Sequence, residues 1–292
     1  MSYKFIIDTN VLSERAADQL VQGGIVSACN SGRFSFYPTP ILLTECLKFS
    51  VTGKIPPRAI KPLTLLAELK WQRLFNEPGG PDGIYTGELE SKPKSAYLFT
   101  DYRAVKQNMT LVLNGGEFPD EAKQEMGAYL MQWEGKKVKN REAYKSMRVD
   151  VIKQLQKDKS LSRKESNFTS FLRLKFEATA IEKIESSINS KIPKNRLVEY
   201  WTKHKERCPY FNKFIEGWLF TAWYFMAVEP EPKIDINAYE DIEHLVYLSG
   251  LNGIVSNEKG FIKAACKTLY PDKQFFSVDQ FVERLKNERV HA

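Results

Sequence analysis

The chain contains little histidine and little cysteine. Three histidines and four cysteines occur among 292 residues, and no two cysteines have the C-x-x-C spacing of structural zinc sites. This scarcity argues against a zinc-binding protein. Because no cysteines are closely spaced, we expect all four thiols to be reduced and mostly buried, as in a cytoplasmic protein.

Long hydrophobic runs are also missing. The most apolar segment, residues 214–228, contains Glu216 and is shorter than the roughly 20 residues that cross a bilayer. Asp8 interrupts the first apolar run, and we therefore expect no signal peptide. The sequence predicts a protein without membrane segments, in which residues 214–228 form a buried helix.

What is present is an ordinary globular composition with an excess of positive charge. Hydrophobic residues make up 42% of the chain and charged residues 27%, and the net charge is +7. The excess is concentrated in residues 136–175, where basic residues outnumber acidic ones by 13 to 4. This concentration favours a surface that binds a polyanion, with a merely solvated helix face as the alternative.

The two ends of the chain alternate strands and helices, as is typical of an α/β domain. Residues 1–56 predict strands at 4–7 and 33–37 and helices at 11–30 and 41–51. Residues 233–292 predict strands at 253–256 and 274–277 and helices at 237–250, 258–269 and 277–289. Capping boxes at Asn237–Glu240 and Ser277–Gln280 mark two of these helix starts.

The middle of the chain has a different character. Residues 57–232 have few strand signals, and we interpret them as a mainly α-helical insertion that splits one α/β domain. Within the insertion, residues 77–96 are rich in glycine, proline and charge, and this composition predicts a loop.

Four carboxylates lie where predicted strands end or predicted helices begin, namely Asp8, Glu45, Asp241 and Glu258. In one parallel sheet all four could meet at the edge where open α/β sheets bind ligands. Carboxylates gathered there would repel one another, and a hard divalent cation such as Mg²⁺ would relieve the repulsion. Such a metal can activate water and stabilise a phosphodiester in its transition state. The pattern therefore predicts phosphoryl chemistry on a polyanion.

The same segments resemble the motifs of PIN-domain nucleases. Residues 6–12 resemble the opening motif of that family, and residues 40–45 resemble the segment that carries its second acidic residue. Residues 237–245 and 252–261 resemble the segments with the third and fourth acids, and residues 274–281 resemble the last strand and helix. The resemblance covers the two ends of the chain, which is under half of its length.

This resemblance implies a PIN-like three-layer α/β/α fold with a central parallel sheet, and cleavage of RNA, or less often DNA, with Mg²⁺ or Mn²⁺. Carried over by position, the metal ligands would be Asp8, Glu45, Asp241 and Glu258. Asn10 would brace them through hydrogen bonds, and Ser256 would hold a carboxylate, a water or a phosphate. Small members of the family are often toxins, so we include an antitoxin or other regulatory partner, and a homodimer, among the expected assemblies.

The chain departs from the family pattern in ways that keep other interpretations open. Glu258 stands where aspartate is usual, Ser256 replaces the commoner threonine, and Asn252 stands where another aspartate often occurs. An inactive scaffold that binds nucleic acid or protein is therefore one alternative to an endoribonuclease. A regulated toxin or phage-defence effector nuclease is another.

Each candidate residue also has a structural interpretation. Asp8 could cap a turn, Glu45 could be solvated, and Glu258 could favour a helix dipole. For the basic insertion, the candidate contacts to nucleic acid are Lys136, Lys137, Lys139, Arg141, Lys145 and Arg148.

Overall fold

The computed structural model describes residues 2–49, 55–157, 168–227 and 237–290. The chain forms two compact units. The first contains Met1–Asn76, Phe99–Gln132 and Gly250–Ala292, and the second contains Glu77–Leu98 and Trp133–Ser249.

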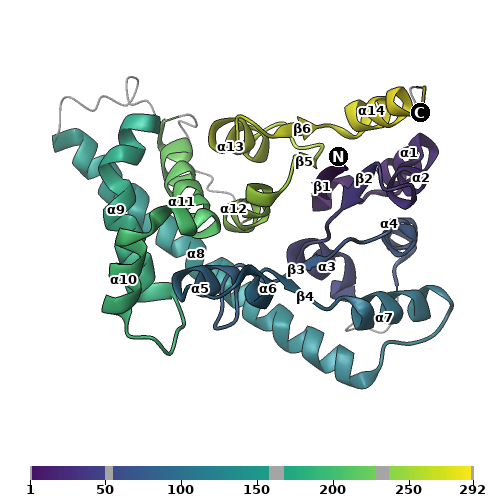
Figure 1. Cartoon of the computed structure of the whole chain (residues 1–292), viewed down its shortest axis with the longest axis horizontal. Helices are drawn as coiled ribbons and strands as arrows, with labels where there is room; N and C mark the ends of the chain where they lie inside the picture. Colours follow the sequence, from purple (N-terminus) through teal and green to yellow (C-terminus); the bar gives the residue numbers. More distant parts are fainter. Residues whose placement is uncertain (1, 50–54, 158–167, 228–236, 291–292) are drawn as a thin grey trace. The chain divides into compact units, whose positions relative to one another are not determined.

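The first unit is built on a four-stranded sheet (Figure 1). Its strands are β1 (Tyr3–Ile7), β2 (Phe34–Phe36), β5 (Gly253–Val255) and β6 (Gln274–Phe276). They lie in the order β2-β1-β5-β6, and every neighbouring pair is parallel. The prediction of an α/β protein with a parallel sheet made from both ends of the chain is therefore confirmed.

The order of the strands creates a switch point between β1 and β5. From β1 the chain continues to β2 on one side, whereas β5 is followed by β6 on the other side. The connections therefore leave in opposite directions from this central pair. In open α/β sheets, the crevice at the carboxyl ends of such a pair is where ligands bind. Asp8 directly follows β1, and Ser256 directly follows β5.

Helices and short strands complete the first unit. They are η1 (Thr9–Val11), α1 (Glu14–Gly23), α2 (Ile25–Asn30), α3 (Pro40–Leu47), α4 (Pro57–Glu68), β3 (Leu74–Phe75), β4 (Phe99–Thr100), α7 (Arg103–Leu113), α13 (Phe261–Leu269) and α14 (Val278–Val290).

The single helix predicted over residues 11–30 is wrong. Ser13 accepts a hydrogen bond from the Ala16 N–H and thereby begins α1, and Gly24 ends it in the left-handed conformation with φ of 83°. Glycine adopts this conformation without steric cost, so the chain turns and starts α2 in the next residue. Because α1 begins only after Ser13, the residues after Asp8 form the separate short 3-10 turn η1.

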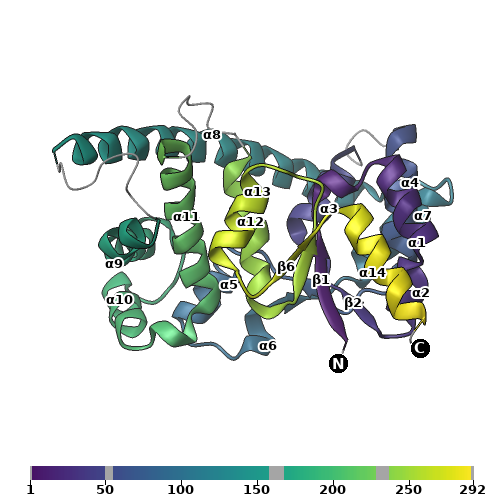
Figure 2. The ribbon, with the colours of Figure 1, turned by 90° about the horizontal axis from the view of Figure 1, so that it is seen from above.

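Aromatic and aliphatic side chains from both ends of the chain form the core of the first unit. Phe5 and Ile7 of β1 are fully buried in it, together with Leu20 of α1. Phe281 of α14 also belongs to this core, and its ring centroid lies 4.9 Å from that of Phe5. Helices α1 and α14 lie side by side (Figure 2). Burial of this apolar surface fixes the carboxyl ends of β1 and β5.

The second unit is helical. It contains α5 (Ile84–Leu89), α6 (Lys94–Tyr97), α9 (Phe168–Ser187), α10 (Lys194–Lys203), η3 (Lys205–Arg207), α11 (Pro209–Ala227), α12 (Ala238–Val246) and all but the last residue of η4 (Tyr247–Gly250). The long helix α8 (Asp120–Lys157) starts in the first unit and continues into the second. The most apolar helix, α11, contacts α9, α12 and α5 and is the centre of this unit. The loop predicted over residues 77–96 is wrong in part, because this segment contains α5 and most of α6.

Two further expectations can be compared with the structure. All four cysteines are free thiols and buried, as predicted. Among the described residues, no helix is long and apolar enough to cross a membrane. The predicted domain limits at residues 56 and 232 differ from the limits of the two units. In particular, residues 57–76 belong to the first unit, whereas α12 belongs to the second.

Gly253 is a position where the sheet leaves no room for a side chain. A Cβ atom there would lie 2.5 Å from the carbonyl oxygen of Gln274 on the neighbouring strand. We expect Gly253→Ala to lower the free energy of unfolding by about 2 kcal/mol through this overpacking, measured by denaturant unfolding. Gly135→Ala on α8 is the control, because no atom lies within 4 Å of its added Cβ and alanine favours a helix. Equal stability of the two variants would contradict the prediction.

Candidate active site

Asp8 is held at the switch point by both its backbone and its side chain. Its N–H donates to the carbonyl oxygen of Val255 at 2.9 Å, which extends the pairing of β1 with β5. Asp8 is 3% exposed, and its carboxylate accepts a hydrogen bond of 2.7 Å from the Ser256 hydroxyl. The side chain makes no capping hydrogen bond to η1. The cap interpretation of Asp8 therefore fails, and its carboxylate is turned toward β5 instead.

Ser256 is fully buried and uses all of its hydrogen-bonding capacity. Its hydroxyl donates its one proton to Asp8, and it accepts from the Asn10 amide at 3.1 Å and from the Glu258 N–H at 3.1 Å. One donor and two acceptor positions are what a hydroxyl offers. Ser256 thus connects β1, η1 and the turn after β5.

Asn10 lies in η1 and joins the same network from the solvent side. Its amide nitrogen donates to Ser256, and its carbonyl oxygen accepts from the Asn257 N–H at 2.9 Å. Asn257 in turn accepts from the Val278 N–H at 3.1 Å, at the start of α14. The geometry suits the bracing role expected of Asn10. The sequence does not single out Asn257, although its position directly after Ser256 could have indicated it.

Glu258 lies in the turn before α13 and not in the helix predicted from that residue. Its carboxylate accepts a hydrogen bond of 3.1 Å from the Ile262 N–H, in the first turn of α13. This contact is the helix-end role that was the structural alternative for Glu258. It satisfies one of the N–H groups that a helix leaves without a partner at its start.

Glu45 comes from α3, whose first turn is capped by the Thr39 hydroxyl. The Glu45 carboxylate forms an ion pair of 2.7 Å with Lys48, and its side chain is 25% exposed. The pair is partly screened by solvent and is therefore weak. Cys46 beside it is buried, and burial, together with the Glu45 charge, raises the pKa of its thiol far above the ordinary value. Burial therefore favours the protonated thiol.

Asp241 lies in the second unit, in the first turn of α12. Helix α12 begins at Ala238, as the predicted capping box required, but the Asn237 side chain makes no capping hydrogen bond. Instead, the Asn237 oxygen accepts from the ammonium of Lys137 at 3.4 Å. Of the four predicted carboxylate residues, Asp8 and Glu258 belong to the described hydrogen-bond network around Ser256 in the first unit.

Two hollows lined by residues of the first unit flank this network. One has a volume of about 530 Å³ and is lined by residues that include Ser256, Glu258 and Ser13. The other has a volume of about 540 Å³ and is lined by residues that include Asn10, Glu45 and again Ser13. The network around Asp8 thus lies beside two spaces large enough for part of a ligand.

The basic residues predicted to bind nucleic acid lie on α8. Lys136 and Lys139 are exposed, whereas Lys137 is buried and its ammonium lies 3.8 Å from the centroid of the Trp133 ring. Lys137 is therefore the least suited of the three to contact a ligand. The side chains of Arg141, Lys145 and Arg148 lie outside the described residues.

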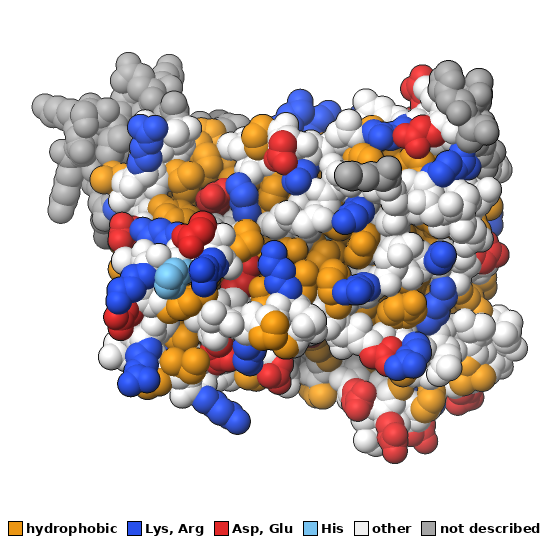
Figure 3. Space-filling view, in the orientation of Figure 1, with side chains coloured by type: hydrophobic (Ala, Val, Ile, Leu, Met, Phe, Trp, Pro, Cys, Tyr) orange, Lys and Arg blue, Asp and Glu red, His pale blue; other side chains and the backbone are white. Residues whose placement is uncertain are grey.

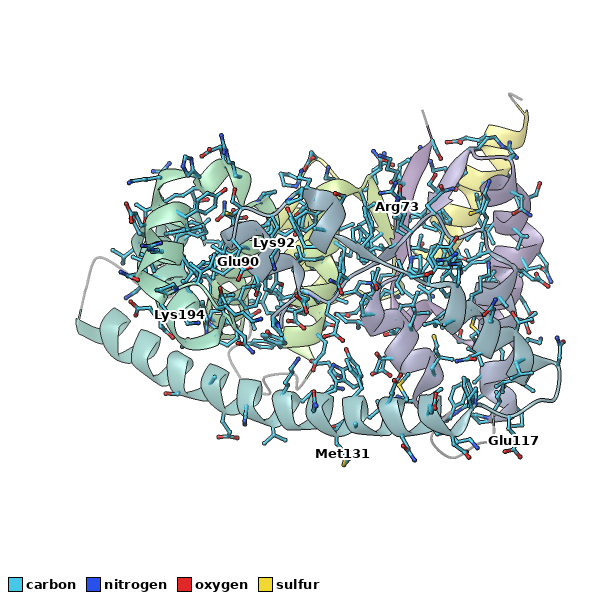
Figure 4. All side chains as sticks on the ribbon, turned by 60° about the horizontal axis from the view of Figure 1, so that its bottom comes forward. Arg73, Glu90, Lys92, Glu117, Met131 and Lys194 are labelled. Carbon is cyan, nitrogen blue, oxygen red and sulfur yellow. The ribbon has the colours of Figure 1, made fainter. Side chains whose placement is uncertain are left out.

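The exposed surface of α8 is mixed in character. Met131 is 74% exposed and points away from the helix in Figure 4, and Val138 is 58% exposed. On the face drawn in Figure 3, Lys and Arg side chains are interspersed with acidic and apolar ones and form no single patch among the coloured residues. Within the described part of the basic segment, the exposed Val138 therefore lies between the exposed Lys136 and Lys139 in the sequence.

The donor atoms at the switch point suit a hard cation in type but are few. Asp8, Asn10 and Ser256 present oxygens to one another, and oxygen is the ligand that Mg²⁺ prefers. Within the described ranges, no group of three or more His, Cys, Asp or Glu residues lies together in a way that could hold a metal ion. Magnesium is commonly bound through one or two carboxylates, with water and substrate phosphate as the other ligands. A single carboxylate at the switch point is compatible with that kind of site.

Comparison with protein-family models, with curated proteins and with solved structures found no match.

Proposed function

We propose that the chain is a divalent-metal-dependent nuclease with a PIN-like fold, and that it acts as an endoribonuclease. One observation carries the proposal. The carboxylate of Asp8 is held by Ser256 at the switch point of a parallel sheet, and Ser256 and Asn10 each line one of two hollows there. This is the position where open α/β folds bind ligands.

The resemblance to PIN-domain nucleases supports the same assignment, because its first and fourth motifs are the two segments that meet here. Asp8 would be the principal ligand of Mg²⁺ or Mn²⁺, and the resemblance assigns Glu45, Asp241 and Glu258 as further ligands. When bound, the metal would supply an activated water and neutralise charge on the phosphodiester. Ser256 and Asn10 keep the Asp8 carboxylate in one orientation, which lowers the entropic cost of forming the site.

The second candidate, an inactive scaffold, is favoured by a specific observation. Glu258 is hydrogen bonded to the start of α13, and Glu45 is paired with Lys48. One oxygen of each carboxylate already has a partner, with which a metal would compete. The scaffold would bind nucleic acid or protein and would have no catalytic activity.

A cleavage assay separates the two candidates. Single-stranded RNA and DNA of the same sequence would be incubated with the protein in Mg²⁺, in Mn²⁺ and in EDTA. We expect cleavage only with metal, and faster cleavage of RNA. We also expect Mn²⁺ to raise the melting temperature, since a ligand at 100 times its Kd stabilises a protein by about 2.7 kcal/mol. No turnover together with an unchanged melting temperature would establish the scaffold and reject the nuclease.

A further inference from the structure

The hollow of about 530 Å³ beside Ser256 is lined by three basic side chains, Arg15, Lys259 and Lys263. None of the three forms an ion pair with a carboxylate among the described residues. Lys263 lies over the ring of Phe275, at 6.0 Å from its centroid. Arg15 and Lys259 are exposed and Lys263 is partly exposed, so all three charged groups are accessible to an anion in the hollow.

Three helices also begin at this hollow. Its lining includes Ser13 and Arg15 at the start of α1, Lys259 just before α13, and Ser277 at the start of α14. The N-terminus of each helix carries a partial positive charge of roughly half an elementary charge. The Glu258 carboxylate offsets this charge at the start of α13. The fields of α1 and α14 therefore add to those of the three side chains.

The two acidic side chains of the hollow reduce this potential without cancelling it. Glu258 is bonded to the Ile262 N–H, and Asp279 accepts a hydrogen bond of 3.0 Å from the Gln19 amide. Three cations against two carboxylates leave an excess of positive charge, to which the helix starts contribute further. The hollow is thus suited to an anion and shares Ser256 with the network around Asp8.

We propose that this hollow binds a phosphate group of a nucleic acid strand, next to the phosphodiester at Asp8. Arg15, Lys259 and Lys263 hold the phosphate as charged donors, and the starts of α1 and α14 add to the field that attracts it. The identification of the strand rests on the proposed function, whereas the affinity of the hollow for phosphate does not. In this arrangement, the hollow sets where along the strand the Asp8 site acts.

Binding in EDTA tests this proposal without cleavage. Fluorescence anisotropy of a labelled single-stranded RNA would compare the wild type with the triple variant Arg15→Gln/Lys259→Gln/Lys263→Gln. The control is Lys4→Gln/Lys70→Gln/Lys267→Gln, which removes the same charge from exposed positions of the same unit outside the hollow. We expect the first variant to weaken binding at least tenfold and the control less than threefold. The slope of log K against log salt should fall by about 0.7 for each phosphate that the variant no longer neutralises.

Two further arms complete the test. Asp279→Asn removes a negative charge from the hollow and should tighten RNA binding two- to threefold. This variant keeps all three cations and therefore tests the site independently of the triple variant. RNA with a 5′-phosphate and RNA with a 5′-hydroxyl distinguish a terminal phosphate from an internal phosphodiester. Equally weakened binding by the triple variant and its control, or no RNA binding by the wild type, would overturn the proposal. Binding through the hollow without metal-dependent cleavage would instead reject only the nuclease function.

Discussion

Asp8→Asn is expected to lower the rate of metal-dependent RNA cleavage by at least about 10³-fold, because a bound metal contributes several kcal/mol to the transition state and each 1.4 kcal/mol is tenfold in rate. The asparagine oxygen can still accept the hydrogen bond from Ser256, so the switch point keeps its structure. Cleavage of a labelled RNA in Mg²⁺ measures the effect, and circular dichroism verifies the fold.

Asp18→Asn is the matched control for this variant. Asp18 is also an aspartate, but it lies on α1 and forms an exposed ion pair of 2.6 Å with Lys61. Exposed pairs of this kind contribute little to stability, so activity and melting temperature should both stay close to those of the wild type. RNA binding in EDTA should be retained by both variants. Undiminished cleavage by Asp8→Asn would reject Asp8 as a metal ligand.

The sheet could be predicted because its strands are short and apolar and are bounded by residues that favour turns. Asp8 and Pro38 follow the first two strands, and the turns before β5 and β6 contain glycine or proline. The order of the motifs then placed both ends of the chain in one sheet. The start of α14 could be predicted for a local reason, since Ser277 and Gln280 make the two reciprocal hydrogen bonds of a capping box.

The partners of the carboxylates could not be predicted in the same way. A carboxylate after a strand has the same sequence signature whether it binds a metal, caps a helix or pairs with a lysine. Glu258 is bonded to the Ile262 N–H, and Glu45 is paired with Lys48. These contacts depend on the exact start of α13 and on the position of Lys48. Spacing alone does not determine these distances.

The helix over residues 84–89 could not be predicted from the sequence for a related reason. Its glycine and its charged neighbours are typical of a loop, but the segment forms α5 because its side chains are buried in the second unit. Glu88 is 2% exposed there, and its two carboxylate oxygens accept from the N–H groups of Tyr210 at 3.2 Å and Phe211 at 2.8 Å. A glutamate that is distant in the sequence thus caps the start of α11. No local sequence pattern predicts this contact between Glu88 and the start of α11.

Glu88 leads to a second large expected effect, on stability. Burial raises the pKa of its carboxyl to about 7, although the two N–H donors and Lys94 favour the charged form. The other titratable groups facing it are Tyr97, Cys208 and Tyr210. Because the folded protein holds a proton here that the unfolded chain has lost, the free energy of unfolding should fall as pH rises from about 4.5 to about 7. The full decrease is about 3 kcal/mol.

Glu88→Gln should remove this pH dependence. The amide cannot ionise, and its oxygen still accepts from one of the two N–H groups, so the variant should be less stable than the wild type at pH 5 and closer to it at pH 7.5. Urea unfolding followed by tryptophan fluorescence suits the measurement, because Trp133, Trp201, Trp218 and Trp223 all belong to the second unit. Glu88→Ala leaves both buried N–H groups without an acceptor and should cost about 3 kcal/mol at pH 5. Because alanine cannot ionise, this difference from the wild type should shrink as pH rises to 7.5. A wild type and a Glu88→Gln variant with parallel pH profiles would show that Glu88 is ionised throughout this range.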